Sequence, residues 1–194
     1  MIDTSNRENI IIKDKKVTIL GLGLSGTSAA KLANHMGAIV FGSDLSMNED
    51  VLSNSWELMN VHHIATETGI NSDRIYDSEL WVVSPGISKN SEIIINGQNQ
   101  NIPIVSEIEF ASWFTSSKII AITGSNGKTT TSHILAKMCK THKVNGRIVK
   151  CRGKGEAKPL ENRAHLLLFH FEIPFPERLA TPAVHTEFFD NFLN

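Results

Sequence analysis

The sequence predicts an α/β protein whose first domain contains a parallel sheet and whose second domain begins at a phosphate-binding turn. Two glycine-rich turns favour this fold class, because each follows an apolar run and precedes a helical pattern, within residues 17–37 and 119–138. Between the turns, short apolar runs alternate with helical patterns, as expected for parallel strands joined by right-handed crossovers. A chain of 194 residues can bury the core of one large or two small domains.

The first glycine turn is Gly21-Leu22-Gly23-Leu24-Ser25-Gly26, which has the spacing G-x-G-x-x-G. It lies between an apolar run and a helical pattern that stops at Gly37, and Asp44 follows at the tip of the next expected strand, residues 38–41. In Rossmann-like folds such a turn approaches a diphosphate, and an acidic residue after the second strand approaches a ribose or a base. On this part of the chain alone NAD binding is the default interpretation. Helix packing without a ligand is the alternative.

The elements between the two turns are expected in alternation. We predict helices at 49–59, 91–98 and 106–114, a short turn or helix at 72–79, and strands at 61–65, 80–83 and 102–105. Ligands of a parallel sheet bind beyond the carboxyl ends of its strands. The first turn, Asp44 and the segment Ser84-Pro85-Gly86 would all lie at that edge.

The second glycine turn is Gly124-Ser125-Asn126-Gly127-Lys128, between an apolar run at 119–122, typical of a buried parallel strand, and a helical pattern at 129–138. Glycines let backbone N–H groups turn inward, and the following helix adds its positive end. Lys128 supplies a cation for the outer phosphates of ATP, and the hydroxyl of Thr129 or Thr130 can hold Mg²⁺. The turn ends as a P-loop does, although its first glycine is only three residues before Gly127. A plain strand-to-helix turn with a surface lysine is the alternative.

Charge divides the chain near residues 110–117. Residues 1–109 carry seven Lys or Arg and fourteen Asp or Glu, whereas residues 110–155 carry nine basic and no acidic residues. A basic block around a phosphate-binding turn favours a polyanion such as ATP, and a solvated basic face is the alternative. Because aromatic residues are sparse in this block and it contains no recognised nucleic-acid-binding module, we expect no nucleic-acid partner.

The chain contains no apolar segment long enough for a membrane span, and residues 1–16 lack the apolar core of a signal peptide. We therefore expect a cytoplasmic protein that is a monomer and has no membrane partner. Its two cysteines, Cys139 and Cys151, have neither metal-ligand spacing nor a disulfide framework, so we expect reduced thiols.

Residues 15–142 resemble the N-terminal third of a Mur ligase. The resemblance rests on five segments and their order in the chain: GLGLSG, GSD, SPGIS, SEIEF and AITGSNGKTTT. The resemblance implies an ATP-dependent, amide-forming ligase of peptidoglycan precursor synthesis, with Mg²⁺ as a second cofactor. It also implies that the first domain binds UDP rather than NAD. The substrates it implies are UDP-N-acetylmuramoyl-L-alanine and D-glutamate.

The resemblance assigns roles to two sets of residues. The set facing the UDP substrate comprises Gly23, Leu24, Ser25, Gly26, Asp44, Ser84, Pro85 and Gly86. The set facing ATP comprises Gly124, Ser125, Asn126, Gly127, Lys128, Thr129 and Thr130. Within the second set, Lys128 is the expected catalytic residue and Thr129 the expected Mg²⁺ ligand. Related enzymes can place a basic residue two positions after the aspartate, where this sequence has Ser46.

We therefore expect a UDP-substrate-binding domain at 1–115, the truncated start of a P-loop ATP-binding domain at 116–144, and an atypical tail at 145–194. The first part of the tail has a loop-like composition, and an apolar run follows at 166–169. The later motifs of the family are not found there, which favours a frame-shifted or disordered tail and a chain unable to finish the ligation. Two other functions stay open: a non-catalytic nucleotide or UDP-sugar binding module, and an NAD-binding oxidoreductase.

Overall fold

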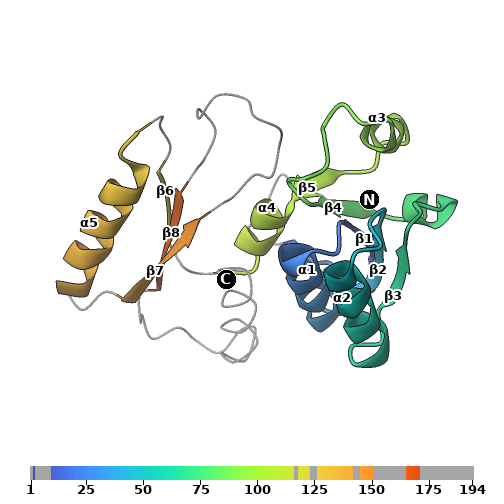
Figure 1. Cartoon of the computed structure of the whole chain (residues 1–194), viewed down its shortest axis with the longest axis horizontal. Helices are drawn as coiled ribbons and strands as arrows, with labels where there is room; N and C mark the ends of the chain where they lie inside the picture. The colour runs from blue at the N-terminus through green and yellow to red at the C-terminus, as the bar shows by residue number, and fades with distance from the viewer. Residues whose placement is uncertain are drawn as a thin grey trace. The chain divides into compact units, whose positions relative to one another are not determined.

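The computed structural model describes residue 2 and residues 10–115, 118–122, 126–141, 145–150 and 165–170. These residues belong to two compact units, of which the first runs to Phe114 and the second begins at Thr115. Figure 1 shows the helices and strands of both units.

The first unit is built on a five-stranded parallel sheet with the order β3-β2-β1-β4-β5. Its strands are β1 (Lys16–Leu20), β2 (Ile39–Asp44), β3 (Ala65–Thr68), β4 (Leu80–Val83) and β5 (Ile104–Ser106). Its helices are α1 (Leu24–His35), α2 (Glu49–Asn60), α3 (Glu92–Asn99), α4 (Glu107–Ser112) and the 3₁₀ helix η2 (Asp73–Tyr76). The strand order reverses between β1 and β4, which makes this pair the topological switch point of a doubly wound sheet. The predicted α/β fold with a Rossmann-like parallel sheet is confirmed.

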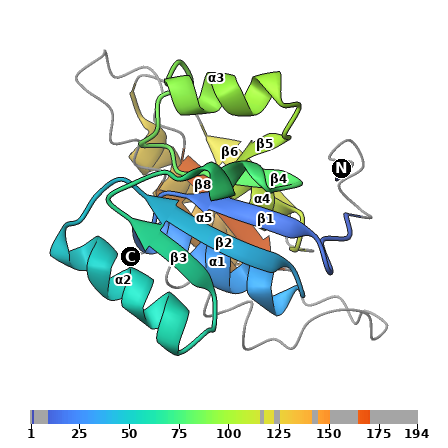
Figure 2. The same ribbon diagram turned by 90° about the vertical axis from the view of Figure 1, so that its right-hand side faces the viewer.

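Alternate residues of the central strands supply two separate hydrophobic cores. Val17 and Ile19 of β1 belong to the core that α1, α2 and α4 cover. Leu20 of β1 and Trp81 of β4 belong to the core on the other face, with Ile94 of α3. Figure 2 shows α3 on one side of the sheet and α1 and α2 on the opposite side. Burial on both faces explains why these strands appear in the sequence as continuous apolar runs.

Most elements of the first unit lie close to their predicted positions, but the strand predicted at 61–65 was wrong. Residues 61–64 leave α2 instead: the Val61 N–H donates to the Glu57 carbonyl oxygen at 2.9 Å, and His63 adopts a positive φ of 55°. The apolar residue Ile64 is buried because it packs beneath this turn, with its N–H donating to the Leu58 carbonyl oxygen at 2.9 Å. Strand β3 begins only at Ala65.

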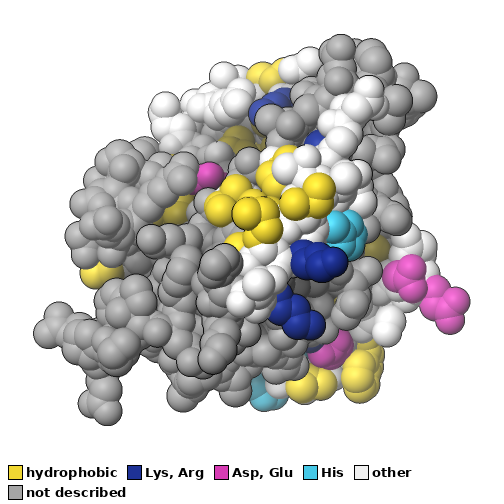
Figure 3. Space-filling view, turned by 90° about the vertical axis from the view of Figure 1, so that its left-hand side faces the viewer, with side chains coloured by type: hydrophobic (Ala, Val, Ile, Leu, Met, Phe, Trp, Pro, Cys, Tyr) yellow, Lys and Arg dark blue, Asp and Glu magenta, His cyan; other side chains and the backbone are white. Residues whose placement is uncertain are grey.

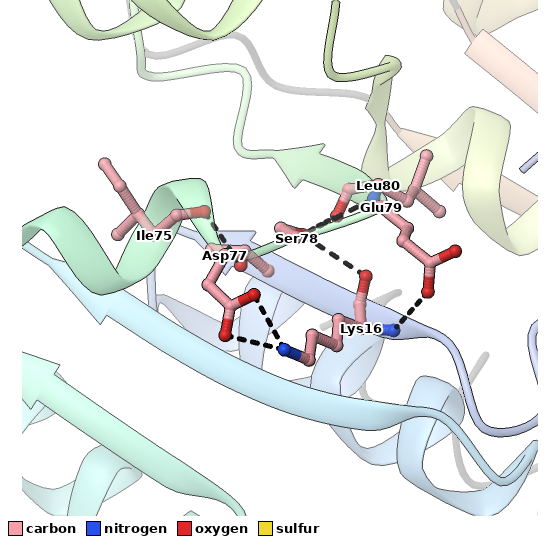
Figure 4. A network of polar contacts seen from close by, with 7 residues as sticks. Lys16, Ile75, Asp77, Ser78, Glu79 and Leu80 are labelled. Carbon is pink, nitrogen blue, oxygen red and sulfur yellow. Dashed lines mark hydrogen bonds and ion pairs between the residues drawn. The ribbon is translucent and has the colours of Figure 1, made fainter. Parts of the chain in front are cut away.

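Polar contacts join the amino end of β1 to the segment that precedes β4. Lys16 Nζ donates to both carboxylate oxygens of Asp77 at 2.7 Å (Figure 4), and Lys15 Nζ donates to Glu79 Oε1 at 2.9 Å. The Lys16 backbone N–H donates to Glu79 Oε2 at 3.3 Å. These hydrogen bonds from Lys15 and from the Lys16 backbone lower the pKa of Glu79 from 4.5 to about 2. The contacts hold together the two strands that flank the switch point, at the edge opposite their carboxyl ends.

We expect the Glu79→Gln variant to lose stability at neutral pH and to match the wild type in strong acid. Because the folded pKa lies below 4.5, the carboxylate stabilises the fold above that pH, and this contribution is lost as the pH falls toward about 2. The effect is small, since the ion pair is solvent-exposed. Urea unfolding across this pH range measures it, with Glu92→Gln on α3 as the control. A difference between Glu79→Gln and wild type that stays constant with pH would contradict the assignment.

The second unit contains a three-stranded sheet and one long helix. Its elements are β6 (Lys118–Ile122), α5 (Lys128–Thr141), β7 (Asn145–Lys150) and β8 (His165–His170), and the strand order is β6-β8-β7. Both strand pairs are antiparallel, with Leu167 of β8 opposite Ile120 on one side and opposite Ile148 on the other.

Two sequence expectations for the second unit were wrong. The run at 119–122 forms a strand, but it pairs antiparallel with β8 rather than parallel, since an apolar run indicates a strand without fixing the direction of its partner. Residues 145–150 form β7 rather than a loop, because their pairing partner, the apolar run at 166–169, lies in the centre of the sheet. Other expectations for residues 151–164 and 171–194 fall outside the described residues.

Across the described residues, no helix has both the length and the apolar character needed to cross a membrane.

Candidate nucleotide-binding site

The first glycine turn is fixed by two glycines that have no room for a side chain. Gly21 has a φ of +100°, and a Cβ placed on it would lie 2.6 Å from the Cβ of Ser84. A Cβ on Gly26 would lie 1.9 Å from the Gly21 carbonyl oxygen. By contrast, a Cβ on Gly23 would meet no atom of the described residues within 4 Å. Gly21 and Gly26 therefore let the turn pack closely, and Gly23 is the glycine of the turn that leaves space for a ligand.

The turn leads directly into the N-terminus of α1. Gly23 is the N-cap residue and supplies no side chain to cap the helix, and the first turn of α1 contains no acidic residue. The first N–H groups of a helix have no partner within the helix, and its N-terminus carries a partial positive charge. Gly23 and Leu24 are exposed and Ser25 is half-buried. This end of α1 can therefore accept an anion from solvent.

Asp44 at the end of β2 holds the turn in place. Its Oδ2 accepts the Leu22 N–H at 2.6 Å, and its Oδ1 accepts the Ser46 N–H at 2.7 Å. The Leu22 carbonyl oxygen accepts a further hydrogen bond from Asn54 Nδ2 of α2 at 2.9 Å. Each carboxylate oxygen of Asp44 keeps a lone pair that these bonds do not use. The contact of Asp44 with uracil or ribose stays a prediction, and its role in ordering the turn was not foreseen from the sequence.

The segment Ser84-Pro85-Gly86 follows β4 and lies beside the turn. The Ser84 N–H donates to the Leu20 carbonyl oxygen at 2.9 Å, which continues the β1–β4 ladder up to the first glycine. Pro85 and Gly86 are exposed, and a Cβ on Gly86 would meet no atom within 4 Å. The structure thus brings the substrate-facing set predicted from the sequence to one edge of the sheet, at the carboxyl ends of β1, β2 and β4.

Glu107, the first residue of α4, lies directly behind the turn. Its side chain is 2% exposed, and its Oε1 is 3.3 Å from the position that a Cβ on Gly26 would take. Burial raises the pKa of the Glu107 carboxyl, and hydrogen bonding with the Ser25 and Ser84 hydroxyls opposes part of that rise. From the sequence, Glu107 is part of the SEIEF segment without a role of its own. The available signal was its position directly after strand β5, at the edge where the other candidate residues lie.

The second glycine turn is described only from Asn126 onward, and Gly124 and Ser125 lie outside the described residues. Gly127 has a φ of +76°, a conformation that favours glycine, and its carbonyl oxygen accepts the Thr131 N–H at 2.9 Å. Helix α5 begins at Lys128, whose exposure is 9%, and the next two residues, Thr129 and Thr130, are exposed.

The outer face of α5 is partly apolar. Ile134 is 55% exposed and Met138 is 57% exposed. Figure 3, which looks onto the side of the molecule where α5 lies, shows hydrophobic side chains next to Lys and His side chains.

Comparison of the sequence with known protein families gives two family models that match the chain. Residues 15–106 match the N-terminal domain of MurD-like Mur ligases, and residues 122–175 match the Mur ligase middle domain. The two domains belong to one family and together span most of the chain, so the chain belongs to the Mur ligase family. The resemblance extends beyond residue 142, where the sequence motifs end.

The individual proteins that the chain matches have a name more specific than that of the family. The UDP-N-acetylmuramoylalanine--D-glutamate ligase of Chloroherpeton thalassium is 39% identical over 127 residues, which are 66% of this chain and 27% of that protein. The enzyme of the same name from Bacteroides thetaiotaomicron is 38% identical over 152 residues, 78% of this chain and 34% of that protein. The chain therefore spans about a third or less of the length of these relatives.

Among solved structures, the murein peptide ligase Mpl of Psychrobacter arcticus is 25% identical, with a TM-score of 0.46. The alignment covers 66% of this chain and 27% of that one.

Proposed function

We propose that the first unit binds the UDP part of UDP-N-acetylmuramoyl-L-alanine beyond the carboxyl ends of β1 and β4. The observation that carries this proposal is the contrast among the three glycines of the turn. Gly21 and Gly26 are closed by neighbouring atoms, whereas the described residues leave free space beside Gly23 at the N-terminus of α1. A diphosphate placed there would receive the N–H groups of Leu24 and Ser25 in the first turn of α1.

Asp44 and Ser84-Pro85-Gly86 would complete this site. Asp44 already accepts two backbone N–H groups, and its remaining lone pairs would accept a ribose hydroxyl or the uracil N–H. Position 46 is a serine whose N–H is bonded to Asp44, so the base would be held without a basic side chain there. Ser84 would line the side of the crevice formed by β4.

The second unit would bind ATP through Gly124 to Thr130. Lys128 would neutralise the outer phosphates, and the exposed hydroxyl of Thr129 suits Mg²⁺. Across the described residues, no group of three or more His, Cys, Asp or Glu could hold a metal ion. Bound Mg²⁺ would neutralise charge on the phosphates of ATP.

We infer that the chain carries the UDP-substrate-binding and ATP-binding parts of a ligase that adds D-glutamate, the reaction for which its relatives are named. A carboxylate oxygen of the L-alanine end attacks the γ-phosphorus of ATP, the bond to ADP breaks, and an acyl phosphate forms. The amine of D-glutamate then attacks the acyl carbon, and phosphate leaves as the amide forms. Lys128 would act by positioning and by charge neutralisation in the first step. This reaction would proceed in the cytoplasm with a monomeric protein.

Calorimetry with three separate ligands tests the proposal on the 194-residue chain. UDP-N-acetylmuramoyl-L-alanine and ATP are expected to bind at independent sites, and NAD is not expected to bind. Binding of NAD alone would overturn the proposal. Binding of the UDP ligand without ADP release in the presence of ATP and D-glutamate would indicate a fragment or a nucleotide-binding module instead of a working ligase.

A further inference from the structure

Glu107 is a buried acidic residue at the proposed diphosphate site, where a negative charge would oppose the ligand. Its side chain is 2% exposed, and its Oε1 has no hydrogen-bond partner within the part of the chain that the structure describes. It lies against Gly26, with the Ser25 and Ser84 hydroxyls as its polar neighbours. A buried carboxylate with an unbonded oxygen is costly, which shifts the protonation equilibrium of Glu107 toward the neutral acid.

The protonation state of Glu107 decides which way the two serine hydroxyls can donate. An ionised carboxylate only accepts hydrogen bonds, so it would take the hydroxyl protons of Ser25 and Ser84 for itself. A protonated carboxyl can instead donate its O–H to one of the serine oxygens. That serine hydroxyl is then free to donate toward an anion on the solvent side of the turn.

We propose that Glu107 is a positioning residue of the diphosphate site that acts in its neutral, protonated form, donating to Ser25 or Ser84 so that the serine hydroxyl turns toward the bound diphosphate. This inference rests on the proposed function of the first unit and adds that Glu107 carries a proton when the ligand is bound. The bound diphosphate disfavours ionisation of Glu107, and ligand binding is therefore coupled to retention or uptake of one proton.

Within the described part of the chain, no charged side chain forms an ion pair with Glu107. Of the elements in contact with α4, helix α1 carries Lys31 and His35, while β4 and β5 carry no ionisable side chain. Lys31 Nζ is paired with Glu57 Oε1 at 2.6 Å, and the only other acid on α4 is Glu109. Asp44, across the turn, is bonded to backbone N–H groups. Burial is therefore the cause of the raised pKa of Glu107, not a neighbouring charge.

The direct test is a titration of the Glu107 carboxyl by carbon-13 NMR, in the free protein and with saturating UDP-N-acetylmuramoyl-L-alanine. The Glu107→Gln variant assigns the signal. We expect a midpoint above 4.5 in the free protein and a higher midpoint, or a carboxyl that stays neutral throughout, in the complex. A ligand that lowers the midpoint, or a complex in which the carboxyl is ionised at neutral pH, would overturn the proposal.

Affinity across pH supplies a second readout that a purely structural role would not change. Gln has the size of Glu, stays neutral and keeps a donor, so Glu107→Gln is expected to bind within about tenfold of the wild type at low pH. Above the carboxyl midpoint the wild type is expected to weaken by up to about tenfold per pH unit, while the variant does not. Glu109→Gln, two residues along the same helix, is the control and should follow the wild type.

The outcomes separate this inference from the function on which it rests. A wild-type chain that binds no UDP ligand at any pH would overturn both. Ligand binding with an ionised Glu107, or with the same pH dependence in wild type and Glu107→Gln, would overturn only the role of the proton. If Glu107→Gln fails to fold, calorimetry of the wild type in buffers of different ionisation enthalpy still decides, because proton release on binding would contradict the proposal.

Discussion

The Gly26→Ala variant is expected to lose about 3 kcal/mol of unfolding free energy and to lose binding of the UDP ligand. Its new Cβ would lie 1.9 Å from the Gly21 carbonyl oxygen, a backbone atom that cannot move without displacing the turn from β1. In an ordinary helix the change from glycine to alanine would be stabilising by about 1 kcal/mol. The sign of the change in unfolding free energy therefore tests the close contact between Gly26 and Gly21. Urea unfolding and calorimetry measure the two effects.

Gly23→Ala is the matched control for this variant, since it makes the same change three residues earlier in the turn. Gly23 has a negative φ of −67°, and its added Cβ would lie more than 4 Å from every atom in the part of the chain that the structure describes. We expect only a small loss of stability, since alanine is a poorer N-cap residue than glycine, and weaker binding of the UDP ligand, because the methyl group would occupy the space left for the diphosphate. Equal losses of stability in both variants would show that the turn does not pack as described.

The Lys128→Ala variant is expected to weaken ATP binding by about ten- to a hundredfold and to leave affinity for the UDP ligand unchanged. A hydrogen bond between charged groups contributes about 1.5–3 kcal/mol, and Lys128 is the lysine at the start of α5 that the P-loop pattern assigns to the phosphates. Calorimetry with each ligand measures both affinities.

Lys137→Ala, an exposed lysine on the same helix, is the control for charge alone. Because the Lys128 side chain is 9% exposed, unfolding of both variants should be compared before their affinities are interpreted. A parallel loss of both ligands in Lys128→Ala would contradict two independent sites.

The parallel sheet of the first unit could be predicted because its strands are buried on both faces. Residues such as Leu80 to Val83 form a continuous apolar run, and glycine turns and polar helices separate such runs in the chain. The end of a helix is harder to predict. Val61 and Ile64 have the composition of a strand, but they complete the turn after α2, where hydrogen bonds back to the helix decide their conformation.

In the candidate site, too, part of the arrangement could be predicted from the sequence and part could not. Gly21, Gly23 and Gly26 could be identified by their spacing, but the spacing does not show which glycine faces neighbouring atoms and which faces open space. The role of Glu107 depends on its contact with Gly26, which is 81 positions away in the chain, and no local pattern contains such a contact. Likewise, the apolar run at 119–122 indicates a strand, whereas its antiparallel partner 165–170 is known only from the fold.

Because β1 and β4 are buried on both faces, the positions that stabilise the fold differ from the positions that would contact a ligand. Substitutions inside these strands disturb one of two cores, whereas the short connections at their carboxyl ends have exposed positions such as Gly23, Leu24 and Gly86. A protein engineer who wishes to exchange the nucleotide proposed to bind there could therefore confine a library to those connections and leave the scaffold intact.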